Sequence, residues 1–225
     1  MTTVAAAADE APVPAEVQSR NAERTRAEIL DVAITEFADK GYAGARVDEI
    51  GERTRTSKRM IYYYFGSKEG LYVAALEQAY HGIRSVELEL DVEAMGAEQA
   101  VRTLAAVTVR YHARHPQFIR LVSIENIHRG EHLGRSAELQ AENSSALGVV
   151  AQILDRGVAA GEFRADVDPL DVHQIISAHA VFPVANRHTF GAIFGVDMLD
   201  EDRVAHQEQV LGDLLVGYLR RTDRA

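Results

Sequence analysis

A run of basic and aromatic residues in the first third of the chain has the composition of a phosphate-binding surface. Between residues 53 and 68 there is no acidic side chain, and the basic ones are Arg53, Arg55, Lys58, Arg59 and Lys68. The same window contains Tyr62, Tyr63 and Tyr64. Successive side chains of a helix are about 100° apart, so at least one of the three hydroxyls faces outward. The window predicts a nucleic-acid contact, since phosphates are met by Lys, Arg and hydroxyl groups; a solvated face beside a tyrosine-edged core is the alternative.

A second pattern, at residues 128–132, has the spacing of a metal site. His128-Arg129-Gly130-Glu131-His132 is the H-x-x-E-H order of inverted zinc proteases, in which two histidines bind zinc and the glutamate is the general base. That chemistry needs an uninterrupted helix and a third ligand, whereas Gly130 disfavours a helix interior. Two alternatives remain: a zinc hydrolase using His128, Glu131 and His132, and a non-catalytic metal site using Glu125, His128 and His132. We expect no enzyme activity, no catalytic residue and no cofactor.

A third group of residues has the composition of a small-molecule pocket. Between residues 111 and 128, aromatic and aliphatic side chains alternate with a few polar ones, as in cavities between helices. A plain hydrophobic core would show the same stripe. The wall residues that we predict are Tyr111, Phe118, Glu125, Asn126 and His179.

Three short helices are expected to position the basic window. Apolar residues at three-to-four spacing predict a helix from Asn21 to Lys40, ended by Gly41 as a left-handed cap. Helices over Val47–Thr54 and Ser57–Tyr64 are separated by two residues and must cross steeply, which is the arrangement of a helix-turn-helix. The third helix begins with Ser57, Lys58 and Arg59, at the end that a recognition helix points towards bases. The expected core is Phe37, Val47, Ile50, Ile61 and Phe65.

The remaining sequence is also helical in its periodicity, and we find no convincing strand. A fourth helix, capped by Ser67, runs towards Glu89 and joins the head to a body. Pro183 lies inside a periodic segment and predicts a kink or break there. The fold class is all-α with about nine helices, and those of the body cover Gly96–Arg114, Pro116–Arg129, Arg135–Ala160, Asp168–Phe190 and Asp200–Arg221.

Composition divides the chain into three parts. Residues 1–19 lack helical spacing and predict a disordered arm, residues 20–66 form the DNA-binding head, and residues 67–225 form the helical body. The net charge of −10 comes from the arm and the body and does not count against DNA binding by the head. The chain has no cysteine, no secretory signal and no apolar run near the roughly 20 residues of a membrane span, so we expect a cytoplasmic protein without membrane contacts.

The segment from Ile61 to Leu71, IYYYFGSKEGL, resembles the signature at the end of the recognition helix and the start of the fourth helix in TetR-family regulators. Upstream, Ile29 to Tyr42 resembles the first helix of that family and its glycine-aromatic ending. The resemblance implies a homodimer whose two heads enter successive major grooves of a palindromic operator. It further implies release by a small-molecule effector bound in the body. Repression is the common mode of the family, although the sequence does not distinguish repression from activation.

The resemblance also assigns DNA contacts by matching position. Base or phosphate contacts fall on Ser57, Lys58, Arg59 and Tyr63. Contacts mainly to phosphate fall on Arg46, Tyr62, Tyr64 and Lys68. The turn departs from the family, because Thr54-Arg55-Thr56 replaces the usual small residue, glycine and aliphatic residue. If Arg55 takes a positive φ it carries a strain of about 1 kcal/mol, and it then becomes an additional DNA contact.

The last two helices contain more apolar residues than one slender bundle requires. Apolar side chains recur between Ile175 and Phe182 and again between Val204 and Leu219. TetR relatives pair their last two helices across a two-fold axis, and the resemblance implies the same four-helix interface here. Packing within one chain, as in a plain helical interaction module, is the alternative.

Overall fold

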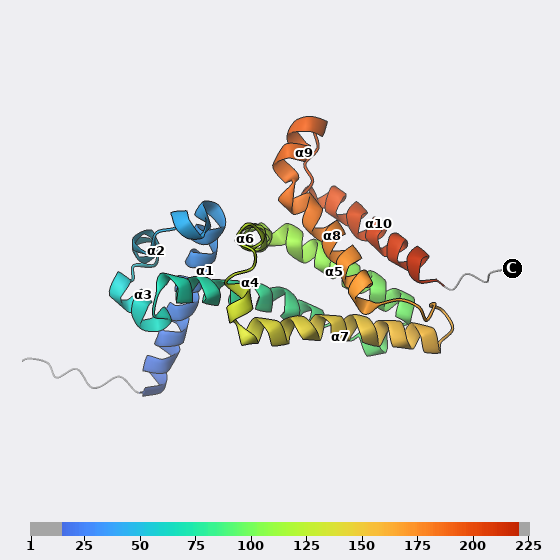
Figure 1. Ribbon diagram of the computed structural model, residues 1–225, viewed down its shortest axis with the longest axis horizontal. Coiled ribbons are helices and arrows are strands. Elements are labelled where there is room, and N and C mark those ends of the chain that lie inside the picture. The colour runs from blue at the N-terminus through green and yellow to red at the C-terminus, as the bar shows by residue number, and fades with distance from the viewer. Residues whose placement is uncertain (1–14, 221–225) are drawn as a thin grey trace, which may run out of the picture.

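The fold is all-α, as the sequence predicts. A computed structural model describes residues 15–220, except for the side chains of 15–19, 140 and 142–144. Within these residues there are ten α-helices, one more than expected, and two short 3-10 helices (Figure 1). The expected arm lies largely outside the described residues, and its last five residues already belong to the first helix, which begins at Ala15.

Helices α1 (Ala15–Gly44), α2 (Val47–Thr54) and α3 (Lys58–Phe65) form the head. The regular part of α1 ends before Gly41, whose φ of 70° is positive as expected, while its ψ of 171° is extended and is not that of a left-handed helical cap. Gly51 permits the tight turn between α2 and α3, because a Cβ there would lie 2.6 Å from the Thr56 carbonyl oxygen. Four of the five predicted core residues are buried, and Phe65 lies at the edge of the core, where the Arg26 guanidinium covers its ring at 5.3 Å.

Helix α4 joins the head to the body. Ser67 caps it as expected, with Oγ accepting from the Gly70 N–H at 3.0 Å. Helices α5 and α7 pack against α4, α8 packs against α5 and α7, and α10 packs against α5. In Figure 1, α6 lies between these helices and the head. The bounds are α4 Lys68–Leu88, η1 Val92–Ala94, α5 Ala97–Arg114, α6 Pro116–Ile127, η2 Leu133–Arg135, α7 Ala137–Ala159, α8 Pro169–Ala185, α9 Arg187–Phe194 and α10 Glu201–Leu219.

The buried apolar side chains fall into two clusters. One joins α1 to α3 with the first part of α4 and with α6. The other joins α5, the second half of α7, α8 and α10. Along α4 the first cluster ends at Ile83, and along α5 the second ends at Val109. Buried polar side chains follow at these two points, namely Arg84 and Glu87 on α4 and His112 on α5.

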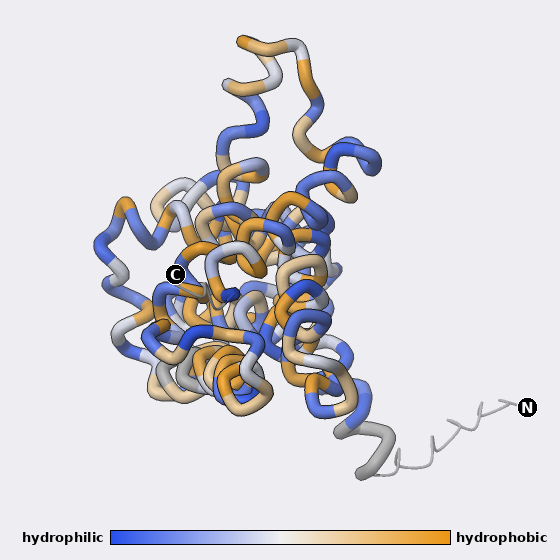
Figure 2. Tube along the Cα trace, turned by 90° about the vertical axis from the view of Figure 1, so that its right-hand side faces the viewer, coloured by the Kyte–Doolittle hydropathy of each residue, from blue (hydrophilic) through white to orange (hydrophobic). Residues whose placement is uncertain are grey.

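The single helix expected over Asp168–Phe190 is in fact two helices. α8 ends at Ala185 and α9 begins at Arg187, with Asn186 between them at φ −105°. Pro183, which cannot donate a helical hydrogen bond, precedes the break by three residues, so a break is confirmed. α9 then projects from the body, and Figure 2 shows hydrophobic residues along this projection. They include Ile193 and Phe194, both of which are exposed.

Candidate nucleic-acid interface

The first turn of α3 presents two basic side chains in different states. Lys58 Nζ lies 2.9 Å from Asp48 Oδ1 on α2, and this hydrogen bond raises the pKa of Lys58. Arg59 is exposed and has no side-chain hydrogen bond or ion pair with any described residue. Ser57 Oγ accepts from the Met60 N–H at 3.3 Å and so caps the helix. Arg59 is therefore the cation of this turn that can meet a ligand without first breaking an internal pair.

The three tyrosines differ in exposure, as their helical spacing requires. Tyr63 is 78 % exposed, and Tyr62 is also exposed, with Lys58 Nζ 6.0 Å from its ring centroid. Tyr64 is partly buried and its ring contacts that of Phe65. The expectation of at least one outward hydroxyl is confirmed, and Tyr63 is the outermost of the three.

The turn before α3 contains a left-handed arginine. Arg55 has φ 53° and ψ 31°, so it does take the positive φ that the sequence analysis considered for it. Its N–H donates to the Glu52 carbonyl at 3.3 Å, while its exposed side chain has no partner among the residues described. The Thr56 hydroxyl, which replaces an aliphatic group, donates to the Thr54 carbonyl at 3.2 Å. The turn keeps its geometry at the cost of a strain of about 1 kcal/mol at Arg55.

A buried carboxylate that the sequence analysis missed holds α1 against α2. The Glu36 side chain is 4 % exposed and lies 2.8 Å from Lys40 Nζ and 3.6 Å from Arg53 Nη1. It also accepts the Arg46 N–H, at the start of α2, at 3.4 Å. The sequence does contain a signal for this carboxylate: Glu36 lies seven residues after Ile29 and so falls on the apolar face of the first helix. Arg46 itself keeps an exposed guanidinium, 3.9 Å from Glu49.

Lys68 lies where the head meets the body. Its Nζ donates to the Ala43 carbonyl at 3.3 Å and lies 5.1 Å from the Tyr42 ring centroid, and burial lowers its pKa. The Tyr42 ring in turn contacts the ring of His132, at 4.8 Å between centroids. His132 Nδ1 is 2.9 Å from Glu125 Oε1, so a line of contacts connects Glu125 on α6 to Lys68 at the start of α4.

The structure does not support the metal alternative. Residues 128–132 form a turn, because Arg129 and Gly130 take φ of 60° and 69°, and the helix expected up to Arg129 ends at Ile127. His128 is exposed, with Nδ1 2.9 Å from the Ile124 carbonyl, whereas His132 is buried against Glu125. No three His, Cys, Asp or Glu side chains in the described part of the chain are grouped to hold a metal ion.

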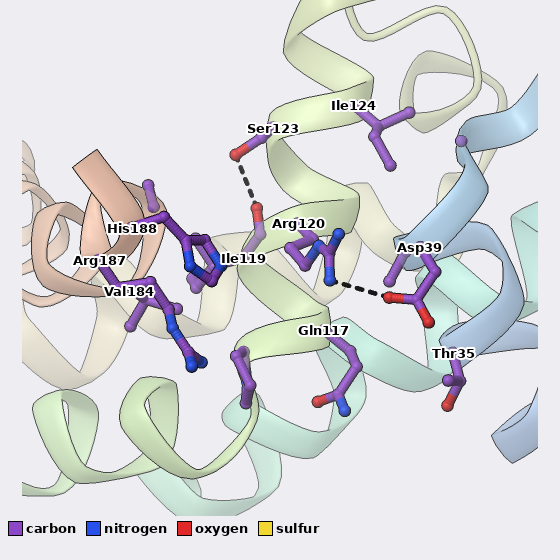
Figure 3. Close-up of a pocket in the computed structure, with 14 residues that line it drawn as sticks. Thr35, Asp39, Gln117, Ile119, Arg120, Ser123, Ile124, Val184, Arg187 and His188 are labelled. Carbon is purple, nitrogen blue, oxygen red and sulfur yellow. Dashed lines mark hydrogen bonds and ion pairs between the residues drawn. The ribbon is translucent and has the colours of Figure 1, made fainter. Parts of the chain in front are cut away.

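A cleft of about 420 Å³ is lined by α1, α6, the end of α8 and the start of α9. Arg120 Nη1 on α6 lies 2.8 Å from Asp39 Oδ1 on α1, and this ion pair bridges one side of the cleft (Figure 3). Figure 3 shows Arg187 and His188 on the opposite side. The head and α6 are thus joined by this ion pair as well as by the buried apolar cluster that they share.

The five predicted pocket residues are not all together. Tyr111 and Phe118 lie near each other, at 6.5 Å between ring centroids, on the inner sides of α5 and α6. Glu125 is 1 % exposed, and its carboxylate is hydrogen-bonded to His132. Asn126 is exposed, and its side-chain amide donates to the Val122 carbonyl of its own helix. His179 lies on the outer side of α8, in a groove that also contains Gln207 of α10.

A steeply crossed helix pair with an exposed basic recognition helix, carried on an all-helical body, defines a helix-turn-helix regulator of transcription. Residues 29–75 match the family model described as bacterial regulatory proteins, tetR family, and residues 98–215 match the tetracyclin repressor-like C-terminal domain. The chain belongs to the TetR family of DNA-binding transcriptional regulators. None of the helices described is long and apolar enough to span a membrane.

Three known proteins illustrate the likeness. The HTH-type transcriptional repressor NicS of Pseudomonas putida is 36 % identical over 205 residues, which cover 91 % of this chain and 97 % of NicS. The solved structure of the transcriptional regulator SCO4942 from Streptomyces coelicolor has a TM-score of 0.67 at 27 % identity, covering 88 % of this chain and 99 % of that one. FadR of Bacillus subtilis, solved with stearoyl-CoA, shares the fold at a TM-score of 0.64 and 17 % identity, covering 84 % and 96 %.

Proposed function

We propose that the chain is a homodimeric, cytoplasmic repressor that binds a palindromic operator and is released by a small-molecule effector. The observation that carries this proposal is that α3 exposes both Arg59, which has no partner among the described residues, and Tyr63, which lies one helical turn further on. The name of NicS as a repressor supports the direction of regulation. A reporter gene with the operator at its promoter tests that direction. We expect expression of the reporter to fall when the chain is present, whereas a rise in expression would identify an activator.

The DNA contacts follow from exposure and charge. Arg59 has the free guanidinium that can pair with guanine O6 and N7, and we assign it to base reading together with Ser57, Lys58 and Tyr63. Lys58 must exchange Asp48 for DNA, so its contribution is smaller than its charge suggests. The phosphate contacts that we assign are Arg46, Arg55, Tyr62, Tyr64 and Lys68.

The dimer would form through the outer face of α8 and α10. This face exposes Phe182 and Leu214, and the groove between the helices contains two buried nitrogen atoms without a hydrogen-bond partner, His179 Nε2 and Gln207 Nε2. A second copy can cover the exposed apolar side chains of this face. Sedimentation equilibrium at micromolar concentration should give twice the chain mass of 24.8 kDa, and a monomer would contradict the dimer.

The effector would enter the interior of the body. FadR holds a small molecule in the same fold, and here the inner side of α5 and α6 brings together Tyr111 and Phe118 of the five predicted wall residues. Glu125 is hydrogen-bonded to His132, so we assign it the role of positioning His132. Asn126 faces outward, so we assign it to the surface and not to the wall of the effector site. Effector binding lowers operator affinity only if the bound body favours a different spacing of the two heads.

A further inference from the structure

One helix of the body has no buried side chain. None of the eight residues of α9, all of which the structure describes, is buried. Ile193 is 72 % exposed and Phe194 is 59 % exposed, and Val196 in the turn that follows is also exposed. Residues 189–196 include no charged side chain. Helices this short are marginal in water unless they pack against another element, so an exposed apolar helix indicates a missing partner.

The large apolar side chains of α9 lie on one face of the helix. Ile193 and Phe194 follow Phe190 by three and four residues, which is the spacing of neighbours on a helix surface. The rings of Phe190 and Phe194 contact each other, with centroids 4.6 Å apart. Figure 2 shows hydrophobic residues at the end of the projection that stands clear of the body. We call residues 187–199 the α9 projection.

The α9 projection continues the outer face of α8 and α10. The ring of Phe190 meets that of Phe182 on α8 edge to face, at 5.2 Å between centroids, so a row of three phenyl rings runs from α8 onto α9. Phe182 also lines the groove between α8 and α10, together with Met198 of the projection. The exposed apolar surface of α9 is therefore continuous with the face that we assign to the dimer.

We propose that the α9 projection of each copy packs against the body of the other copy, which covers Phe190, Ile193 and Phe194. The apolar row starts at Phe182, inside the dimer face, and a two-fold axis through that face brings the second copy alongside both projections at once. The lack of charge in residues 189–196 also suits the core of an interface between identical subunits, whereas nucleic acids and anionic lipids are met by Lys and Arg. This inference rests on the proposed homodimer and adds to it a contact beyond α8 and α10.

Cross-linking of the full-length chain tests this contact directly. The chain has no cysteine, so Ala192→Cys gives a single attachment point for a benzophenone maleimide and leaves the three apolar side chains of α9 in place. The labelled variant exchanges subunits with isotope-labelled wild-type chain, and the mixture is then irradiated and digested. Cross-linked peptides should join the label to isotope-labelled peptides of the second copy. Ala27→Cys, at an exposed alanine of α1, is the matched control and should give no such cross-link.

Polar substitutions measure what the contact contributes to the dimer. Ile193→Asn combined with Phe194→Asn should raise the dissociation constant of the dimer at least about tenfold, because apolar side chains of both copies lose their cover. Both side chains are exposed in the single chain, so the variant should keep the helical circular dichroism of the wild type. Ile127→Asn, at an isoleucine of α6 that is 79 % exposed, is the matched control and should dimerise as the wild type does. Sedimentation over a dilution series measures the constants.

The outcomes separate this inference from the proposed dimer. If the chain is a dimer but the label at position 192 reacts only within its own chain, the contact is overturned while the dimer stands. The same holds if the double variant dimerises as tightly as the wild type, or if α9 instead joins dimers into larger assemblies. A monomer at micromolar concentration would overturn the proposed dimer and this contact together.

Discussion

Arg120 Nη1 on α6 lies 2.8 Å from Asp39 Oδ1 on α1, and the pair ties the body to the head across an open cleft (Figure 3). Both side chains are about half exposed, so the pair should contribute less than about 1 kcal/mol to the free energy of unfolding. Its effect should instead appear in the position of the head, because the pair joins α1 to α6 and the proposed release by an effector requires the head to shift relative to the body.

Arg120→Gln should therefore leave stability nearly unchanged and alter the factor by which effector lowers operator affinity, by about twofold or more. Urea unfolding and operator titrations with and without effector measure the two quantities. Arg114→Gln, at an exposed arginine on α5, is the control. A drop in stability of several kcal/mol, or an unchanged effector response, would contradict this account.

Lys68→Ala and Arg59→Ala should weaken DNA binding in different ways. Loss of a phosphate contact at Lys68 should lower affinity for all sequences and reduce the slope of log affinity against log salt by about 1. Loss of Arg59 should also relax sequence preference, by about 1–3 kcal/mol for its base pair. Titrations over a range of salt, with operator and with scrambled DNA, check both. Equal and salt-independent losses in the two variants would exclude these roles.

Arg55 allows backbone strain to be separated from charge. Arg55→Gly and Arg55→Ala both remove the cation and should reduce the salt slope equally, by about 1. Only glycine adopts φ 53° without strain, so the glycine variant should be more stable than the alanine variant by about 1 kcal/mol. Denaturant unfolding compares them. Alanine as stable as glycine would mean that the left-handed turn carries no strain.

Glu36→Gln should destabilise the head. The amide keeps the shape but loses the ion pairs with Lys40 and Arg53, in a buried position where an unpaired group costs about 1–3 kcal/mol. Operator affinity should fall as well, since α2 supports α3. Glu52→Gln, at an exposed acid on α2, is the control and should leave unfolding within about 0.5 kcal/mol. If the Glu36 variant were as stable as this control, the Glu36 carboxylate would not stabilise the head.

His112 should make the body sensitive to acid. Its pKa lies near 4 in the fold and near 6.5 in the unfolded chain, so the neutral form is favoured by folding. The stability that this contributes is present above pH 6.5 and is lost as the pH falls towards 4, by at most about 3 kcal/mol. His112→Gln should flatten that part of the curve of unfolding free energy against pH, and the exposed His188→Gln should not. Identical curves for wild type and the His112 variant would contradict the prediction.

The head could be predicted from sequence because its signals are local. Ser57 and Ser67 cap their helices through the next turn, Gly41 interrupts α1, and the three residues between α2 and α3 leave room only for a tight turn. The place of Arg55 in the turn raised a positive φ as a condition, and the structure meets it. Such features depend on neighbours within a few residues, which the sequence shows directly.

The body was less predictable because its contacts are distant in sequence. Periodicity placed Glu125 and His179 on apolar stripes, but only the fold shows that one is bound by His132 and that the other lies on the outer side of α8. The histidine pattern at 128–132 had the spacing of a zinc site but not the continuous helix that such a site needs, because Arg129 has a positive φ. Arg84 attracted no attention because an arginine in a helix is ordinarily solvated, and its burial is a property of the packed bundle.

Selection of bound DNA from a random pool by the full-length chain tests the central claim most directly. A homodimer with two recognition helices should enrich a palindrome whose half-sites lie about one helical turn, or a multiple of it, apart. The enriched half-site should lose its preference at one base pair when Arg59→Ala is used in the same experiment. A pool without enrichment, or one enriched in a single unrepeated half-site, would contradict the operator-binding dimer.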